Sequence, residues 1–145
     1  MFLDASAIVA ILNDEDDADL LLTRIERVEE TIYYSSLVVF EAVIALSRQA
    51  KVVQLGEHAS TPPDFIRRAQ SSVHGLLAEI GATEIDMSAG LHSTALDAAR
   101  TYGRFVGHPA KLNFGDCFSY ACAKQLRSPL LFVGDDFAKT DIEAA

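Results

Sequence analysis

The sequence predicts an α/β fold, in which a mostly parallel sheet is covered by helices on both faces. Three observations lead to this prediction. Short apolar segments alternate with longer segments of helical periodicity along the whole chain. Half of the 145 residues are hydrophobic, which is enough to bury a sizeable core. No linker, internal repeat or low-complexity stretch interrupts the pattern, so we expect one domain over residues 1–145.

The first half of the chain alternates two predicted strands with helices. Phe2-Leu3 is a short buried strand, and Ala5 to Leu12 has helical composition. Leucine and isoleucine recur at helical spacing from Asp17 to Glu29, which indicates a half-exposed helix. Thr31 to Tyr34 is β-branched and aromatic and predicts the second strand. A serine pair then caps an apolar helix, Leu37 to Ala50.

The second half continues the alternation. Gln54 to Pro63 contains glycine and paired prolines and is expected to be a loop. A helix from Asp64 to Ile80 is closed by glycine, and Thr83 to Ile85 is the third strand. The remaining predicted segments are a helix from Ser88 to Tyr102, a loop from Gly103 to Lys111, a helix from Asn113 to Leu126 and a strand from Leu130 to Val133. We therefore expect a sheet of about four to five strands.

Charge and residue usage limit the possible functions. The net charge of −9 suits a nucleic-acid binder only if metal covers the carboxylates and the cations are gathered in one place. No apolar run approaches the roughly 20 residues of a membrane span, and the first residues lack the basic region of a signal peptide. We therefore expect a cytoplasmic protein without membrane contact. The cysteines and histidines do not have the spacing of zinc ligands.

Four acidic positions lie where a solvated surface does not explain them. Asp4 ends the first strand, and Asp135 and Asp136 follow the last one. Glu41 and Asp116 are each the only charged residue within a long apolar stretch. The carboxyl ends of parallel strands line the ligand crevice of α/β folds. Because burying an unpaired carboxylate is costly, these acids need a cation as partner.

Each of these acids also has an ordinary structural explanation. Asp4 is a favoured helix cap, Asp116 can interact with a helix dipole, and Gly-Asp-Asp is a good turn sequence. Glu41 can form a buried ion pair with Arg48 or Lys111. Together, however, like charges in one crevice repel unless a cation binds between them. Oxygen ligands with open positions suit Mg²⁺ or Mn²⁺, and such sites carry out phosphoryl chemistry.

Four sequence motifs contain these acids. They are Phe2-Leu3-Asp4-Ala5-Ser6-Ala7, Ser36 to Glu41, Asn113 to Ala121, and Leu130 to Phe137 with its Gly-Asp-Asp-Phe. In order and spacing they resemble the motifs of PIN-domain ribonucleases, and most closely those of bacterial VapC-type toxins. The resemblance implies a PIN-like three-layer fold and an endoribonuclease that depends on Mg²⁺ or Mn²⁺. It also implies a homodimer that a small VapB-like antitoxin neutralises.

The resemblance assigns roles to individual residues. The expected catalytic and metal-binding acids are Asp4, Glu41, Asp116 and Asp135, with Asp136 as the alternative to Asp135. Ser6 would orient a ligand or the attacking water, or serve only as a first-turn hydroxyl. Asn113 would fix Asp116, or simply cap the helix that carries it.

The loop before the third acid is the expected RNA contact. It carries three cations and a histidine without any acid: Arg100, Arg104, His108 and Lys111. The interleaved Tyr102 and Phe105 offer stacking surfaces for unpaired bases. A solvated loop without RNA contacts is the alternative.

Two other functions fit parts of the pattern. A haloacid-dehalogenase-type phosphatase also opens on a strand and an aspartate, but it needs a second aspartate two residues later, where Ser6 stands. A catalytically degenerate PIN-like domain that serves as a protein-interaction module would retain the same fold. Only an activity assay separates that module from the ribonuclease.

Overall fold

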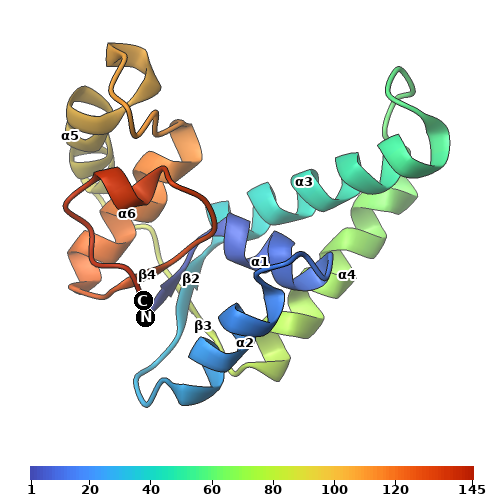
Figure 1. Cartoon of the computed structure of the whole chain (residues 1–145), viewed down its shortest axis with the longest axis horizontal. Coiled ribbons are helices and arrows are strands. Elements are labelled where there is room, and N and C mark those ends of the chain that lie inside the picture. Colours follow the sequence, from blue (N-terminus) through green and yellow to red (C-terminus); the bar gives the residue numbers. More distant parts are fainter.

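A four-stranded parallel sheet lies at the centre of the molecule (Figure 1). The structure is a computed structural model that describes all residues, 1–145. The strands are β1 (Phe2–Leu3), β2 (Tyr33–Ser35), β3 (Thr83–Ile85) and β4 (Leu130–Leu131), in the spatial order β3-β2-β1-β4. Every pair is parallel, so the predicted parallel sheet is confirmed.

Helices cover both faces of the sheet (Figure 1). One side carries α1 (Ala5–Leu12), α2 (Ala18–Arg27), α3 (Ser36–Leu55) and α4 (Pro63–Glu79). The other side carries α5 (Leu91–Tyr102) and α6 (Phe114–Leu126), with the 3₁₀ helices η1 (Arg104–Val106) and η2 (Phe137–Lys139) at the loops. This arrangement confirms the three-layer α/β fold. None of the helices combines the length and apolar character that crossing a bilayer requires.

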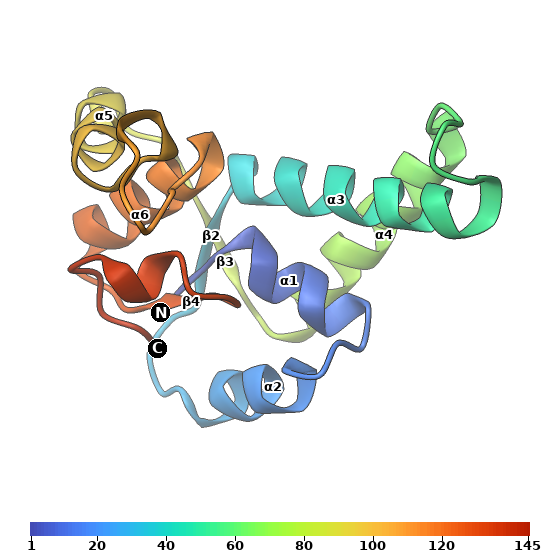
Figure 2. The same ribbon diagram turned by 45° about the horizontal axis from the view of Figure 1, so that its top comes forward.

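Helices α3 and α4 form a hairpin that projects from the body of the molecule (Figure 2). α3 continues to Leu55, whereas the sequence predicted an end at Ala50 and a loop from Gln54. Packing against α4 extends the helix, and Gly56 ends it with a φ of 89°. The Lys51 ammonium then donates a hydrogen bond to the Glu57 carbonyl at 2.8 Å and ties the hairpin loop to α3.

Three further predicted boundaries differ from the structure, each for a local reason. β2 begins at Tyr33 because the Thr31 carbonyl accepts a hydrogen bond from the N-terminal ammonium. β4 ends at Leu131, and the Val133 amide donates to the Ser6 hydroxyl instead of a neighbouring strand. α5 begins at Leu91 rather than Ser88, because Gly90 adopts a left-handed conformation.

The carboxyl ends of the central strands place the candidate residues together. β1 is completely buried, and the Asp4 amide directly after it donates to the Leu131 carbonyl of β4 at 2.9 Å. β2 runs without a break into α3, because Ser35 caps that helix through its hydroxyl. The start of α1, the first turns of α3 and the loop after β4 therefore meet at one edge of the sheet.

Candidate active site

A hollow of about 500 Å³ lies at this edge of the sheet. Side chains from α1, α3 and the start of α6 line it: Asp4, Ser6, Val9, Phe40, Glu41, Ile44, Arg48, Asn113 and Asp116, together with Ala5 and Ala45. Three of the four predicted acidic positions thus come from distant parts of the chain to one surface hollow. The two supporting residues predicted from the sequence, Ser6 and Asn113, are also there.

Asp4 caps α1 and also faces the hollow. Its side chain is only 4% exposed. One carboxylate oxygen accepts hydrogen bonds from the Ser6 amide at 2.9 Å and from the Ser6 hydroxyl at 2.6 Å. The same hydroxyl accepts from the Val133 amide at 3.1 Å. Ser6 therefore fixes the Asp4 carboxylate and links it to the loop after β4.

Asp116 is held by a capping box at the start of α6. The Asn113 side-chain oxygen accepts from the Gly115 amide at 2.7 Å and from the Asp116 amide at 3.1 Å. In return, one Asp116 carboxylate oxygen accepts from the Asn113 amide at 2.7 Å. Asn113 thus caps the helix and restrains Asp116 through the same set of bonds. The second carboxylate oxygen of Asp116 makes no hydrogen bond.

The Glu41 carboxylate reaches from α3 to the backbone of Gly115, so closely that a Cβ atom added there would collide with it. Burial raises the pKa of the Glu41 carboxyl to about 7, with further increases from the charges of Asp4 and Asp116. The alternative ion pairs with Arg48 or Lys111 do not form, because the three ion pairs of the chain involve other residues. Glu41 is therefore a carboxyl without a cationic partner, facing two other acids.

The pKa of Asp116 is raised to about 6, chiefly by burial. The hydrogen bond from the Asn113 amide opposes this increase, the charges of Asp4 and Asp136 add to it, and the charge of Arg104 opposes it. Asp136 therefore lies within electrostatic reach of Asp116, whereas Asp135 does not contribute. Both aspartates are exposed, and they precede the buried Phe137, which packs against Phe132 with ring centroids 5.1 Å apart.

The donor set suits a hard divalent cation that retains water. All converging donors are carboxylate, hydroxyl or amide oxygens, and repulsion between carboxylates contributes to both raised pKa values. No group of three or more acidic, histidine or cysteine side chains is close enough together to hold a metal ion by itself, so water and substrate oxygens would have to supply the remaining ligands. Mg²⁺ characteristically uses one or two carboxylates and fills its other positions with water and phosphate oxygen. The open arrangement of acids fits that pattern.

Two members of the predicted RNA-contact loop are engaged within the protein. Arg100 forms an ion pair with Asp97 on the same helix. The His108 ring nitrogen accepts from the Ala110 amide at 3.1 Å, and its ring packs edge-on against Tyr102 at 5.3 Å. Tyr102 is therefore occupied by packing and does not offer the stacking surface that the sequence suggested.

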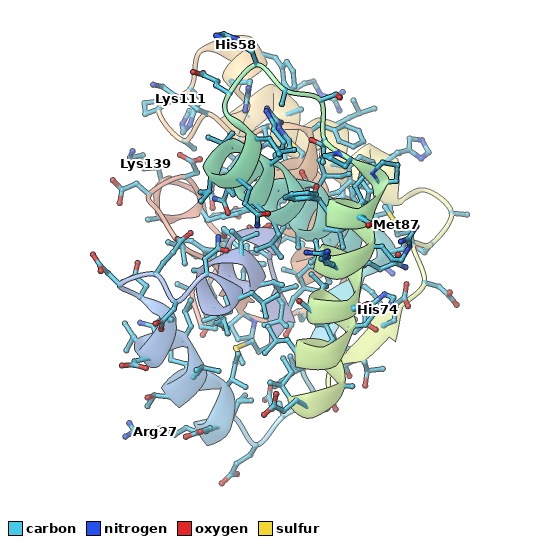
Figure 3. The ribbon with its side chains drawn as sticks, turned by 90° about the vertical axis from the view of Figure 1, so that its right-hand side faces the viewer. Arg27, His58, His74, Met87, Lys111 and Lys139 are labelled. Carbon is cyan, nitrogen blue, oxygen red and sulfur yellow. The ribbon has the colours of Figure 1, made fainter.

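The other two cations of the loop face outward. Arg104 on η1 makes no ion pair and lies close enough to Asp116 to affect its pKa. Lys111 adopts a positive φ of 53° and projects into solvent (Figure 3). Phe105, between them in the loop, is 67% exposed. Of the four predicted contacts, Arg104 and Lys111 are the ones without a side-chain partner in the protein.

Several other side chains of the hollow, and one polar cluster elsewhere, were not among the predicted site residues. Phe40 and Arg48 line the hollow from α3. Arg48 lies seven residues, or two helical turns, after Glu41, and this spacing was the available signal for it. The missed cluster joins α6 to the C-terminal segment. There Asp141 accepts from the Tyr120 hydroxyl at 2.5 Å and pairs with Lys124 at 2.8 Å. No local pattern indicates that pairing, because its partners are about twenty residues apart.

Comparisons with known proteins agree with this fold. Residues 1–143 match the PIN domain family. A VapC ribonuclease of Rhizobium meliloti is 39% identical over 141 residues, covering 97% of this chain and 98% of the relative. Ribonuclease VapC42 of Mycobacterium tuberculosis is 34% identical over 145 residues, covering 100% of this chain and 98% of the relative. The crystal structure of Mycobacterium tuberculosis VapC20, described as a toxin that cleaves the sarcin-ricin loop, superposes with a TM-score of 0.67. The two sequences are 14% identical, and the superposition covers 99% of this chain and 97% of VapC20.

Proposed function

This chain belongs to the PIN-domain family, and we propose that it is an endoribonuclease that acts as the toxin of a VapBC-type toxin–antitoxin pair. One observation carries the proposal. Asp4, Glu41 and Asp116 come from three separate elements to one hollow, where none of them forms an ion pair with a basic side chain. Such a cluster costs folding energy unless a cation binds there. The VapC ribonucleases that are similar over nearly their full length support the same activity.

Asp4, Glu41 and Asp116 would hold the divalent metal, with a fourth acid from the loop after β4. We prefer Asp136 to Asp135 for that role, because the charge of Asp136 acts on Asp116. Bound Mg²⁺ or Mn²⁺ would lower the pKa of a coordinated water and stabilise the leaving oxygen of the phosphodiester. The protein itself restrains two of the ligands, Asp4 through Ser6 and Asp116 through Asn113. This restraint is what second-shell hydrogen bonds provide at metal sites.

The RNA would enter beside η1. The charge of Arg104 acts on Asp116, and Lys111 lies further along the same loop. Both carry charges that can contact phosphates next to the scissile bond. Cleavage of cytoplasmic RNA by such an enzyme would injure the cell, so a tight inhibitor is expected.

Two surfaces fit the protein partners that the family implies. A hollow between α1, α3 and α4, with Leu12, Leu46 and Phe65 among its lining residues, suits the apolar side chains of a VapB-like antitoxin. An arginine of that peptide can pair with the acids and exclude metal. A larger apolar hollow between α5, η1 and α6 contains the exposed Phe105 and Phe114 and suits a second copy of this chain.

Cleavage of structured cellular RNA by the purified chain tests the proposed function. Activity should require added Mg²⁺ or Mn²⁺, disappear with chelator, and be suppressed by co-purified antitoxin from the neighbouring gene. An inactive chain that nevertheless binds a protein partner would instead identify the degenerate interaction module. A chain that is harmless on expression and binds no neighbour's product would refute the toxin assignment alone.

A further inference from the structure

One exposed face of α3 forms a wall of the acid-lined hollow. Phe40, Glu41, Ile44, Ala45 and Arg48 all line the hollow from this helix. Residues three, four and seven positions apart lie on the same side of an α-helix. Glu41 and Arg48 therefore belong to one stripe of α3, separated by two turns, or about 10 Å along the helix axis.

Arg48 has no partner within the protein. Its side chain is exposed, makes no hydrogen bond and takes no part in the three ion pairs of the chain. The guanidinium nevertheless stands at an acid-rich hollow, two turns from Glu41. A free arginine in this position is available to an anionic ligand.

The hollow continues along α3 beyond Arg48. A second depression is lined by Ala45, Arg48, Gln49, Val52 and Val53. It shares Ala45 and Arg48 with the acid-lined hollow, so the two form one groove with Arg48 at the junction. Arg104 acts on Asp116 from η1, outside this wall. A chain that crosses the acids therefore meets a cation on α3 as well as one on η1.

Phe40 provides an apolar surface in the same hollow. Its side chain is 64% exposed although it directly precedes Glu41 in the middle of an apolar segment. Helix α3 buries Val38, Ala42, Val43 and Leu46 against the core, so Phe40 lies on the opposite, outward side. An exposed ring beside a phosphate-cleaving site is a surface on which an unpaired base can stack.

We infer that Arg48 and Phe40 on α3 hold the RNA strand on the side of the acids away from η1, with Arg48 on a phosphate and Phe40 against a base. This inference rests on the proposed ribonuclease function. The spacing of two helical turns places Arg48 at a phosphate next to the cleaved one, not at the reacting phosphorus. Both side chains are therefore positioning residues.

Charge favours RNA over the inhibitory peptide as the ligand of Arg48. An antitoxin arginine directed at the acids would approach a second guanidinium of the same sign, which opposes binding. A polyanion is attracted by Arg48 and repelled by the uncovered acids, and metal at the acids removes that repulsion. RNA with bound metal therefore satisfies both parts of the groove.

The test measures RNA binding in variants that share the inactivating substitution Asp116→Asn, which blocks cleavage and itself removes one of the carboxylate charges that repel RNA. A fluorescein-labelled single-stranded oligoribonucleotide is titrated at several salt concentrations in the presence of Mn²⁺. We expect Arg48→Gln to lower the slope of log affinity against log salt by about 0.7, the value of one lost phosphate contact. Phe40→Ala should weaken binding by roughly 5- to 100-fold and leave that slope unchanged, and Phe40→Tyr should restore the affinity.

Arg27→Gln is the matched control. Arg27 is also an exposed arginine outside any ion pair, but it lies on α2, at the opposite end of the molecule from Lys111 (Figure 3). This variant should keep the full salt slope. Thermal melting of every variant establishes that the chain remains folded.

Three outcomes would overturn the inference. If the wild-type chain cleaves RNA but Arg48→Gln keeps the full salt slope, the inference fails and the proposed function stands. If Arg48→Gln instead weakens only the antitoxin complex, this face of α3 belongs to the protein partner. Absence of both RNA binding by the parent variant and cleavage by the wild-type chain would refute the function and the inference together.

Discussion

Glu41 on α3 and Gly115 on α6 approach so closely that no side chain fits between them. A Cβ atom added to Gly115 would lie 1.9 Å from one Glu41 carboxylate oxygen and 2.0 Å from the other. The glycine therefore lets the Glu41 carboxylate lie against the first turn of α6, beside Asp116. This contact explains why a glycine, a poor helix former, occupies the second position of α6.

We predict that Gly115→Ala displaces the Glu41 carboxylate and lowers cleavage by about 10- to 100-fold, the range for losing a residue that orients a metal ligand. The chain should remain folded, because the end of a flexible side chain can move. Gly75→Ala is the control, since a Cβ there meets nothing within 4 Å. That substitution should add about 0.5–1 kcal/mol to the free energy of unfolding and leave cleavage unchanged. Full activity of Gly115→Ala would contradict a fixed role for Glu41.

Asp4→Asn and Asp116→Asn should each reduce cleavage at least about 100-fold, because the amide removes a charge that holds metal. Neither should unfold the chain, since asparagine is also a good helix cap and can accept the same backbone hydrogen bonds. RNA cleavage and circular-dichroism melting measure the two effects. Asp19→Asn on α2, outside the hollow, should behave like wild type. Near-normal turnover by either site variant would show that the substituted aspartate serves only as a structural residue at the start of its helix.

Substitution of the adjacent aspartates identifies the fourth acid. We expect Asp136→Asn to lower cleavage and Mn²⁺ affinity more than Asp135→Asn does, because only Asp136 acts electrostatically on Asp116. Both residues are exposed, so neither change should affect the melting temperature strongly. The reverse ranking would assign the role to Asp135, as expected from the motif alone.

Ser6→Ala should weaken both the fold and the activity. The hydroxyl donates to Asp4 and accepts from the Val133 amide, so its removal leaves that amide unpaired. We expect a loss of about 1–2 kcal/mol in the free energy of unfolding and an additional drop in cleavage. Ser71→Ala removes only an exposed hydrogen bond to the Arg67 carbonyl and should change stability by less than about 0.5 kcal/mol. Normal cleavage by Ser6→Ala would make Ser6 an ordinary first-turn hydroxyl.

The raised pKa of Glu41 predicts how stability depends on pH without metal. Its carboxyl titrates near pH 7 in the folded chain and near 4.5 in the unfolded chain. Between these values the native state holds more protons, so the stabilising contribution of Glu41 is complete below pH 4.5 and is lost as pH rises through 7. Because Glu41 is only partly buried, solvent screening limits the effect to about 1–2 kcal/mol.

Urea unfolding in EDTA at a series of pH values measures this dependence. Glu41→Gln should remove the loss, so the difference in unfolding free energy between variant and wild type should grow from pH 4.5 to 7. Millimolar Mn²⁺ should stabilise wild type most at the upper end of this range, because metal competes with protons. A difference between the proteins that does not vary with pH would show that Glu41 is ionised normally.

The sequence by itself determined the architecture and the three principal acids. Alternation of apolar segments with helices implied a parallel sheet, and Asp4 directly after the first strand had to lie at its carboxyl edge. Glu41 and Asp116 stood out because a lone charge in an apolar helix has no solvated explanation. Strand ends were less predictable. The last strand, for example, stops before Val133, because the Val133 amide donates its hydrogen bond to the Ser6 hydroxyl and not to a neighbouring strand.

Only the tertiary structure decided which other charged and polar side chains lie close to these acids. Asp136 rather than Asp135 affects Asp116, Arg100 and His108 are engaged within their own region, and Arg48 stands free at the acid hollow. These distinctions depend on distances between α3, η1, α6 and the loop after β4. Local periodicity specifies which face of a helix or strand is buried. Electrostatic interactions and hydrogen bonds depend instead on the distance between groups in space, and the packing of the whole core sets that distance.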